Sequence, residues 1–199
     1  MTEMRSVHGP EVERVLEHLR AGPARLGAGR LLTVDGPSGS GKSTLARRAA
    51  EATGGATVSV DDLLEGWHGG IDRAVTTLVE GVLVPLSAGR PGCYRRYDWH
   101  RERFGARVEV VPGAVLVVEG VGAGARALDP YRTTSVWLDA PPELRRTRAL
   151  ARDGEAFEPY WEHWAALEAA HFAAEETASR ADLSFVRGSQ HAEQRPDDE

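Results

Sequence analysis

The sequence predicts a single α/β domain in which helices cover both faces of a mainly parallel sheet of about five strands. Three observations lead to this prediction. Short apolar segments alternate with helical segments, a glycine-rich loop joins one apolar segment to a helix, and the length of 199 residues suits one domain. Strands that alternate with helices pair in parallel through right-handed crossovers, so this order predicts a sheet that is covered on both sides.

The predicted elements follow one another in a regular order. A helix is expected first, over residues 11–20, because Val12, Val15, Leu16 and Leu19 recur at helical spacing. Short apolar runs bounded by turn residues predict strands over residues 30–35, 56–60, 114–119, 134–139 and 181–186. Further helices are predicted over residues 44–52, 71–86, 142–153 and 158–178.

Two segments are predicted to lack regular structure. Residues 89–105 are polar, aromatic and basic, which indicates a loop or an insertion. The polar tail, residues 188–199, is predicted to be disordered. Within the first of these segments, the run Tyr94 to Arg101 interleaves aromatic rings with arginines. Such a run suits stacking on a base, and it suits equally a half-exposed loop whose rings pack on the sheet edge. Trp161 and Trp164, three residues apart on a predicted helix, indicate core packing.

The composition is that of a soluble globular protein, with 41% hydrophobic and 27% charged residues. No apolar run approaches the roughly 20 residues of a membrane span, and the first residues lack the apolar segment of a signal peptide. We therefore expect a cytoplasmic protein without a membrane partner. The single cysteine, Cys93, excludes an internal disulfide and a multi-cysteine zinc site. The net charge of −6 argues against nucleic acid as a partner.

The glycine-rich loop matches the whole pattern G-x-x-x-x-G-K-[ST] between a predicted strand and a predicted helix. Glycines let the loop curl so that backbone N–H groups point at phosphate oxygens, and the helix adds the positive end of its dipole. Lys42 is placed to reach the outer phosphates, and the Ser43 hydroxyl to bind Mg²⁺. The loop therefore predicts a P-loop NTPase three-layer sandwich that binds ATP with Mg²⁺. The predicted nucleotide-binding residues are Gly36, Ser38, Gly39, Ser40, Gly41, Lys42, Ser43 and Thr44.

Lysine usage narrows the class of P-loop protein. Lys42 is the only lysine among 24 basic residues, so the other 23 are arginines. A GTPase reads guanine with an Asn/Thr-Lys-x-Asp element, which a chain with no other lysine cannot contain. The Ser-Gly-Gly-Gln signature of ABC-type ATPases is also absent, and oligomeric motor ATPases usually need a longer chain. The remaining class is that of small-molecule kinases, whose sheet carries a mobile arginine-bearing lid.

Acidic side chains follow two of the predicted strands, at the sheet edge where ligands bind in open α/β folds. Asp61 and Asp62 follow the second strand, and Glu119 ends the strand over residues 114–119. A carboxylate there can accept the proton of an attacking hydroxyl or hold Mg²⁺ through water. Asp61 is the first candidate for the base, and Ser43, Glu119 and Asp61 are the candidate metal ligands. A helix cap at Asp61, and a cap or surface acid at Glu119, are the alternatives.

Arginines crowd the helix predicted over residues 142–153. Arg145, Arg148 and Arg152 share one face of it, where three guanidinium groups repel one another unless an anion faces them. A triphosphate undergoing transfer is such an anion, so we predict a lid over residues 142–157. Arg145 and Arg148 are the candidate catalytic arginines and Arg152 a nucleotide-binding one. The alternative is a solvated face with acidic neighbours.

At these residues the chain resembles the uridine kinase branch of P-loop kinases, which also holds pantothenate kinase and phosphoribulokinase. The matching segments are VDGPSGSGKST (residues 34–44), VDDL (60–63), YDWHRER (97–103), VVEGV (117–121) and LDAPPELRRTRALARDG (138–154). The resemblance covers about residues 30–155. It departs from the family where Leu63-Leu64-Glu65-Gly66-Trp67 replaces an aromatic pair after the base aspartate, and where the segment from Tyr97 to residue 114 is short.

The resemblance implies roles for particular residues. Asp61 corresponds to the catalytic base, while Tyr97, Asp98 and His100 correspond to residues that hold the nucleoside. Glu119, with Gly120, corresponds to the Glu-Gly pair after the central strand and borders the acceptor. The arginines at 145, 148 and 152 correspond loosely to those of the lid.

The chain is thus predicted to comprise an N-terminal helix and linker (1–29), a P-loop kinase domain (30–187) and a tail (188–199). The expected reaction is transfer of the γ-phosphoryl group of ATP to a hydroxyl of a small molecule, with a nucleoside such as uridine favoured by the resemblance. Alternatives are a nucleoside monophosphate, a pantothenate-like acid or an antibiotic as acceptor, or a nonenzymatic nucleotide-binding regulator. An anionic acceptor stays open because of Arg95, Arg96, Arg101 and Arg103. A homo-oligomer is compatible with the sequence.

Overall fold

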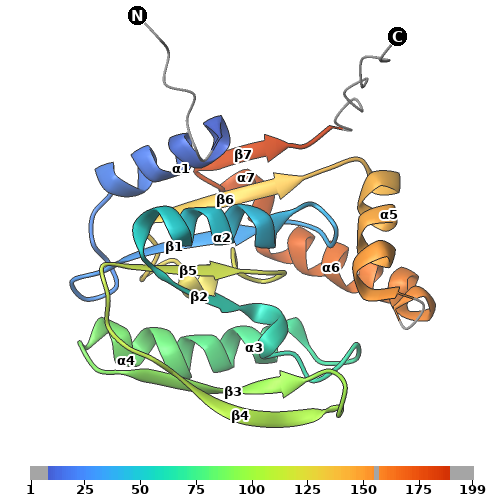
Figure 1. Ribbon diagram of the computed structural model, residues 1–199, viewed down its shortest axis with the longest axis horizontal. Coiled ribbons are helices and arrows are strands. Elements are labelled where there is room, and N and C mark those ends of the chain that lie inside the picture. Colours follow the sequence, from blue (N-terminus) through green and yellow to red (C-terminus); the bar gives the residue numbers. More distant parts are fainter. Residues whose placement is uncertain (1–8, 155–156, 189–199) are drawn as a thin grey trace, which may run out of the picture.

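A computed structural model describes residues 9–154 and 157–188. Its centre is a sheet of five parallel strands in the order β2-β5-β1-β6-β7, which runs from the lower to the upper part of the sheet in Figure 1. The strands are β1 (Arg30–Asp35), β2 (Ala56–Ser59), β5 (Val115–Glu119), β6 (Thr134–Asp139) and β7 (Leu183–Val186). This arrangement confirms the predicted α/β fold.

Helices cover both faces of the sheet because successive strand residues point to opposite sides. Leu32 and Val117 pack with α1 (Pro10–Ala21) and α2 (Lys42–Thr53) on one face. Leu31 and Val118 pack on the other face, which is covered by the helices α3 (Ile71–Leu78), α4 (Val84–Ser87) and α6 (Trp161–Glu175). The result is a three-layer sandwich in which the N-terminal helix shares the core of the domain.

Most of the predicted helices are present, with differences at their ends. The helix expected over residues 71–86 contains a π-helical turn, η2 (Val79–Leu83), between α3 and α4. Pro85 in α4 has no N–H to donate, and a π-turn before it accommodates the missing bond. The helix expected over residues 158–178 is divided, because Glu176 adopts a left-handed conformation (φ 51°) between α6 and α7 (Thr177–Arg180). A short 3-10 turn, η5 (Glu158–Tyr160), precedes α6.

Residues 89–105 were expected to form a loop or an insertion, and the loop alternative is wrong. The chain forms an antiparallel hairpin there, β3 (Gly92–Asp98) with β4 (Arg103–Val110), which lies beyond the β2 edge and below α3 and α4 in Figure 1. A register shift between Arg95 and Tyr97 places two exposed arginines in succession between the buried Tyr94 and Tyr97. This irregularity removes the strict alternation by which a strand is recognised in sequence.

The remaining predictions fall at the ends of elements. Helix α5 (Pro142–Asp153) occupies most of the predicted lid, whose residues 155–156 lie outside the described residues. The predicted tail, apart from Gly188, also lies outside them, as do residues 1–8 of the N-terminal segment. Within the described ranges, no helix combines the length and the apolar character needed to cross a membrane.

Candidate active site

The phosphate loop runs from the end of β1 to the start of α2 and is enclosed by backbone on two sides. Gly36 and Gly39 adopt φ angles of 144° and 79°, which favour glycine. A Cβ atom at Gly36 would lie 2.0 Å from the carbonyl oxygen of Leu138, and one at Gly39 would lie 2.1 Å from that of Arg145. The loop is therefore held between the end of β6 and the first turns of α5.

Lys42 begins α2 and is buried, with 8% of its surface exposed. Its Nζ donates a hydrogen bond to the carbonyl oxygen of Pro37 at 3.1 Å, so the ammonium group lies across the loop. The Ser40 N–H donates to the same carbonyl at 3.2 Å. The buried Ser40 hydroxyl has no hydrogen-bond partner among the described residues. The ammonium group is therefore held at the loop, where the pattern predicts phosphate oxygens.

Two of the three predicted metal ligands, Ser43 and Glu119, lie next to each other. The Ser43 hydroxyl donates to Glu119 Oε2 at 3.1 Å, which brings the start of α2 to the carboxyl end of β5. Magnesium prefers oxygen ligands and is commonly bound by one or two protein groups together with phosphate oxygens and water. A hydroxyl and a carboxylate beside a phosphate loop fit this requirement. No group of three or more His, Cys, Asp or Glu side chains in the described ranges is arranged to hold a metal without such help.

Replacing Glu119 with glutamine should raise the Mg²⁺ concentration needed for half-maximal activity by about tenfold, because a neutral amide oxygen replaces a charged ligand. A titration of phosphotransfer against free Mg²⁺ at saturating ATP measures this. Glu17→Gln, at an exposed position of α1, is the control and should leave the titration unchanged. Equal Mg²⁺ requirements in wild type and the Glu119 variant would remove Glu119 from the metal site.

The two aspartates after β2 have different surroundings. Asp62 Oδ2 accepts hydrogen bonds from the Tyr94 hydroxyl at 3.1 Å and from Arg96 Nε at 2.9 Å, so it anchors the hairpin. Burial and the nearby Asp62 charge raise the pKa of Tyr94. The Asp61 carbonyl oxygen accepts a hydrogen bond from Trp99 Nε1 at 3.3 Å. Both aspartates lie on the 3-10 turn η1 (Val60–Asp62).

Asp61 and Glu119 lie at the same edge of the sheet. In the parallel pair β2–β5, Ser59 is opposite Glu119, and Asp61 follows two residues later. The structure therefore brings Asp61, Glu119 and Ser43 to one end of two neighbouring strands, beside the phosphate loop.

A buried carboxylate that the sequence analysis did not single out contacts the phosphate loop from α6. Glu168 is 3% exposed, and its Oε2 accepts a hydrogen bond from the Ser38 N–H at 3.0 Å. Burial raises the pKa of Glu168, an effect opposed by the Ser38 N–H and by the charge of Lys42. Trp164, one turn earlier, donates from Nε1 to the Ser38 hydroxyl at 2.9 Å. The only sequence signal for this contact is an acidic residue within an Ala-rich helix.

Asp35, the last residue of β1, is a second buried carboxylate that the sequence analysis gave no role. Its Oδ2 accepts hydrogen bonds from the N–H groups of Gly124 at 2.7 Å and Gly122 at 3.2 Å. Burial raises its pKa to about 6, and the Gly124 N–H and the Lys42 charge oppose that rise. Asp35 thus joins the start of the phosphate loop to the glycine-rich segment that follows β5.

Asp35 should make the protein less stable as the pH rises from about 4 to about 6. The folded protein holds a proton on this carboxyl up to a pKa of about 6, whereas the unfolded chain releases it near 3.8. The folded state therefore loses about 3 kcal/mol of relative stability across this window. Asp35→Asn does not titrate, so its free energy of unfolding in urea should lack this component between pH 4 and 6. The exposed Glu13→Gln is the control, and parallel curves for wild type and Asp35→Asn would contradict the expectation.

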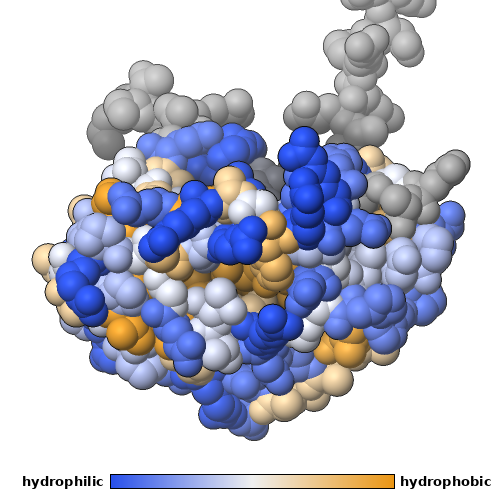
Figure 2. Space-filling view, turned by 90° about the horizontal axis from the view of Figure 1, so that it is seen from below, coloured by the Kyte–Doolittle hydropathy of each residue, from blue (hydrophilic) through white to orange (hydrophobic). Residues whose placement is uncertain are grey.

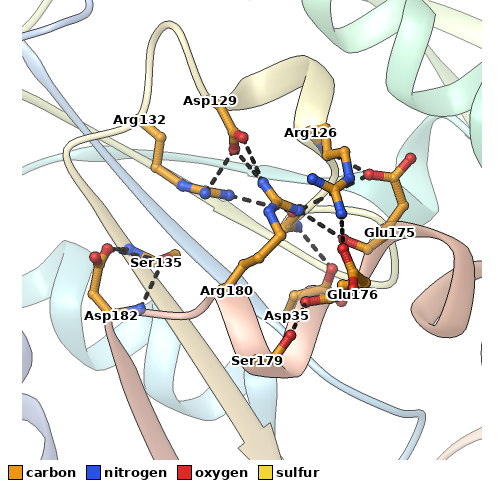
Figure 3. A network of polar contacts seen from close by, with 11 residues as sticks. Asp35, Arg126, Asp129, Arg132, Ser135, Glu175, Glu176, Ser179, Arg180 and Asp182 are labelled. Atoms are coloured by element: carbon orange, nitrogen blue, oxygen red, sulfur yellow. Dashed lines mark hydrogen bonds and ion pairs between the residues drawn. The ribbon is translucent and has the colours of Figure 1, made fainter.

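An ion-pair network also holds the glycine-rich segment after β5, on the side of its backbone that does not contact Asp35. Arg132 and Arg180 converge on Asp129, each with an N–O distance of 2.6 Å (Figure 3). The same two guanidinium groups donate to the carbonyl oxygen of Gly124 at 3.2 and 3.3 Å. The Gly124 N–H donates to Asp35, and the Gly124 carbonyl oxygen accepts from the two arginines. Both backbone groups of Gly124 are therefore held in place. Burial lowers the pKa of Arg132, which the nearby Asp129 charge opposes.

The three predicted lid arginines occupy different positions on α5. Arg145 is mostly buried and donates from Nε to the carbonyl oxygen of Ala140 at 3.0 Å, and it lies 3.5 Å from carboxylate oxygens of Asp139 and Glu168. Arg148 lines a cleft beside the phosphate loop. Arg152 is exposed on the last turn. Arg145 and Arg148 are therefore the two that lie next to the loop.

The predicted acceptor residues lie on the hairpin. Tyr97 is 7% exposed and packs edge-on against Trp99 and Phe104, with ring centroids 5.3 Å away in each case. Asp98 Oδ1 accepts hydrogen bonds from the backbone N–H groups of the turn that follows, including that of His100 at 3.1 Å. His100 and Arg103 are exposed. The structure therefore gives Asp98 a turn-stabilising role and leaves the other two polar side chains at the surface.

An aromatic cluster connects the hairpin to the phosphate loop. Trp67, in the segment between β2 and α3, stacks on Phe157 with ring centroids 4.2 Å apart and contacts Trp99 at 4.6 Å. Trp67 also meets Trp164 at 6.1 Å, and Trp164 bonds to the loop as described above. The cluster consists of Trp67, Tyr97, Trp99, Phe157, Tyr160, Trp161 and Trp164. The predicted core packing of Trp161 and Trp164 is confirmed.

A groove of about 620 Å³ lies between α3 and the hairpin. Leu63 and Phe104 supply apolar surface, and Arg73, Arg95 and His68 supply basic groups. Glu65 lies 2.7 Å from Arg73 and offsets part of this charge. Figure 2, which views the molecule from below, shows that hydrophilic side chains cover most of this side and leave smaller apolar areas between them.

Comparison with solved structures supports the assignment of the fold. A possible uridine kinase from Bacillus stearothermophilus matches with a TM-score of 0.62 and 21% identity, over 87% of this chain and 96% of that chain. A candidate fructose transport system kinase from Silicibacter sp. TM1040 matches with a TM-score of 0.57 and 21% identity, over 91% and 100% of the two chains. No protein-family model and no curated protein sequence matches the chain. The chain therefore shares the P-loop kinase-like fold of these two structures.

Proposed function

We propose that the protein is an ATP-dependent small-molecule kinase, which transfers the γ-phosphoryl group to a hydroxyl of its acceptor with the help of Mg²⁺. One observation carries this proposal. The Ser43 hydroxyl contacts Glu119, and Asp61 lies two residues after Ser59, the residue of β2 that pairs with Glu119. This supports a metal-binding pair and a nearby candidate for the base at the carboxyl ends of two neighbouring strands, next to the phosphate loop.

Each group has a part in the proposed reaction. The loop N–H groups and Lys42 hold the β- and γ-phosphates, and Ser43 and Glu119 hold Mg²⁺, which offsets phosphate charge when bound. Asp61 orients the acceptor hydroxyl and accepts its proton as the new O–P bond forms and the bond to ADP breaks. Arg145 and Arg148, beside the loop, stabilise charge on the group in transfer.

A nucleoside such as uridine is the acceptor that we favour, on the strength of the sequence resemblance and of the uridine kinase-like fold. The aromatic cluster next to Asp61 supports an acceptor with a flat ring. An anionic acceptor is the second candidate, because Arg73, Arg95 and His68 line the groove between α3 and the hairpin.

A screen of ATP consumption tests the proposal. Purified protein with Mg²⁺ is given nucleosides, nucleoside monophosphates, sugars and small hydroxy acids in turn, and ADP release is measured against an acceptor-free control. We expect one class to stimulate ADP release and to yield a phosphorylated product by mass spectrometry. A flat response to all nucleosides would overturn the uridine assignment. If no acceptor stimulates ADP release although ATP binds, the protein is a nucleotide-binding module.

A further inference from the structure

A cleft of about 800 Å³ adjoins the phosphate loop, and its lining includes neither Ser43 nor Glu119. Gly41 and Thr44 of the loop and α2 form its floor, and Arg148 of α5 and Arg187 after β7 form two of its walls. Glu11, on the first turn of α1, closes it from the N-terminal end of the chain. We refer to it as the α1 cleft.

The α1 cleft suits the nucleoside part of a triphosphate donor. The phosphates are expected at the loop N–H groups and Lys42, and the metal-binding pair occupies the Ser43 side, so the nucleoside extends past Gly41 and Thr44. The volume falls within the range of about 300–1,000 Å³ typical of small-molecule sites. Arg48, Arg148 and Arg187 all line it, and planar guanidinium groups stack on bases and pair with phosphates. The cleft's one lining carboxylate, among the described residues, is that of Glu11.

Glu11 holds Arg187 in a fixed orientation. Glu11 Oε2 accepts hydrogen bonds from Arg187 Nη2 at 2.5 Å and from Nε at 3.1 Å. The pair is partly shielded from water, with 20% of the arginine side chain and 32% of the glutamate side chain exposed. The Arg187 N–H also donates to the Asp139 carbonyl oxygen at 2.8 Å, which fixes the backbone beside the end of β6.

The other edge of the same guanidinium faces the phosphate loop. A Cβ atom at Gly41 would lie 2.9 Å from Arg187 Nη1, so this nitrogen lies close to the loop at the residue before Lys42. Nη1 makes no hydrogen bond to another described residue, whereas Nε and Nη2 are engaged by Glu11. A guanidinium group held along one edge is pre-organised to use its remaining N–H groups on a ligand.

We propose that Glu11 is a positioning residue of the nucleotide site, which holds Arg187 against the phosphate loop so that Arg187 binds the nucleoside triphosphate. The inference rests on the proposed function, because it takes the donor to be a nucleoside triphosphate. It makes helix α1, which precedes the first strand of the sheet, a part of the donor site.

Calorimetric titration of the full-length protein with ATP and Mg²⁺, without an acceptor, tests this. Arg187→Met should raise the Kd by about tenfold or more, since it removes charged hydrogen bonds to the donor. Glu11→Gln should raise it less, by about three- to tenfold, because Arg187 stays but is no longer held. Glu13→Gln, an exposed acid on the same helix, is the matched control and should leave the Kd unchanged.

The exchanged pair Glu11→Arg/Arg187→Glu separates positioning from a purely structural role. It should recover the Tm lost in the single variants while ATP binding stays weak, since a carboxylate now lies beside Gly41. Wild-type affinity in Arg187→Met, or full recovery of affinity in the exchanged pair, would overturn the inference. Wild-type protein that binds ATP but phosphorylates no acceptor overturns only the proposed kinase activity. Wild-type protein that binds no ATP overturns both.

Discussion

Lys42→Ala should lower phosphotransfer by at least about 100-fold and weaken ATP binding, because the variant loses the one ammonium group at the phosphate loop. Groups that stabilise charge in the transition state are commonly worth about 10²–10³ in rate. Lys42 is buried and its Nζ bonds to the Pro37 carbonyl oxygen, so the loop also loses a hydrogen bond. Measurement of kcat and of the Kd for ATP gives both effects.

Lys42→Arg is the matched variant for that measurement. It keeps the charge but replaces a compact ammonium group with a flat guanidinium group, which fits poorly across a tight loop. We expect partial recovery of ATP binding and little recovery of kcat. Thermal unfolding of each variant checks that the fold is retained. Unchanged affinity and activity in Lys42→Ala would contradict the assignment of the loop as the phosphate site.

Asp61→Asn should leave ATP binding near the wild-type value and lower kcat by about 10²–10⁴-fold, the usual contribution of a general base. The amide keeps the size of the carboxylate but cannot accept a proton from the acceptor hydroxyl. ATP affinity by calorimetry and phosphotransfer with the acceptor found in the screen separate the two effects.

Asp62→Asn is the comparison for Asp61→Asn. Asp62 bonds to Tyr94 and Arg96, so its replacement should loosen the hairpin and lower the Tm, with a smaller effect on kcat. If Asp62→Asn abolishes phosphotransfer and Asp61→Asn does not, the base has been assigned to the wrong residue.

The sheet and the phosphate loop could be predicted because their signals are local. Each strand of the main sheet is a short apolar run, and the loop has a complete motif between a strand and a helix. Both depend on residues that are close in sequence, and the structure places the strands where they were expected. The hairpin was missed because its register shift brings Arg95 and Arg96 together and hides the alternation.

The buried carboxylates could not be predicted for a different reason. Glu168 and Asp35 acquire their surroundings from residues far away in sequence, since Glu168 meets Ser38 across 130 positions and Asp35 meets Gly124 across 89. Asp35 ends a predicted strand directly before the loop motif, but nothing near it in the sequence shows that it is buried against Gly124, and nothing near Glu168 distinguishes it from a surface acid. The pair of Glu11 and Arg187, which are 176 positions apart, is hidden in the same way.

The aromatic cluster gives the two sides of the phosphate loop different optical properties. Four of the five tryptophans, Trp67, Trp99, Trp161 and Trp164, lie in or beside the cluster on the acceptor side. The described residues that line the α1 cleft include no aromatic ring. Intrinsic fluorescence is therefore concentrated where the acceptor is expected to bind, while Trp164, through its bond to Ser38, should also respond to the phosphates of the donor.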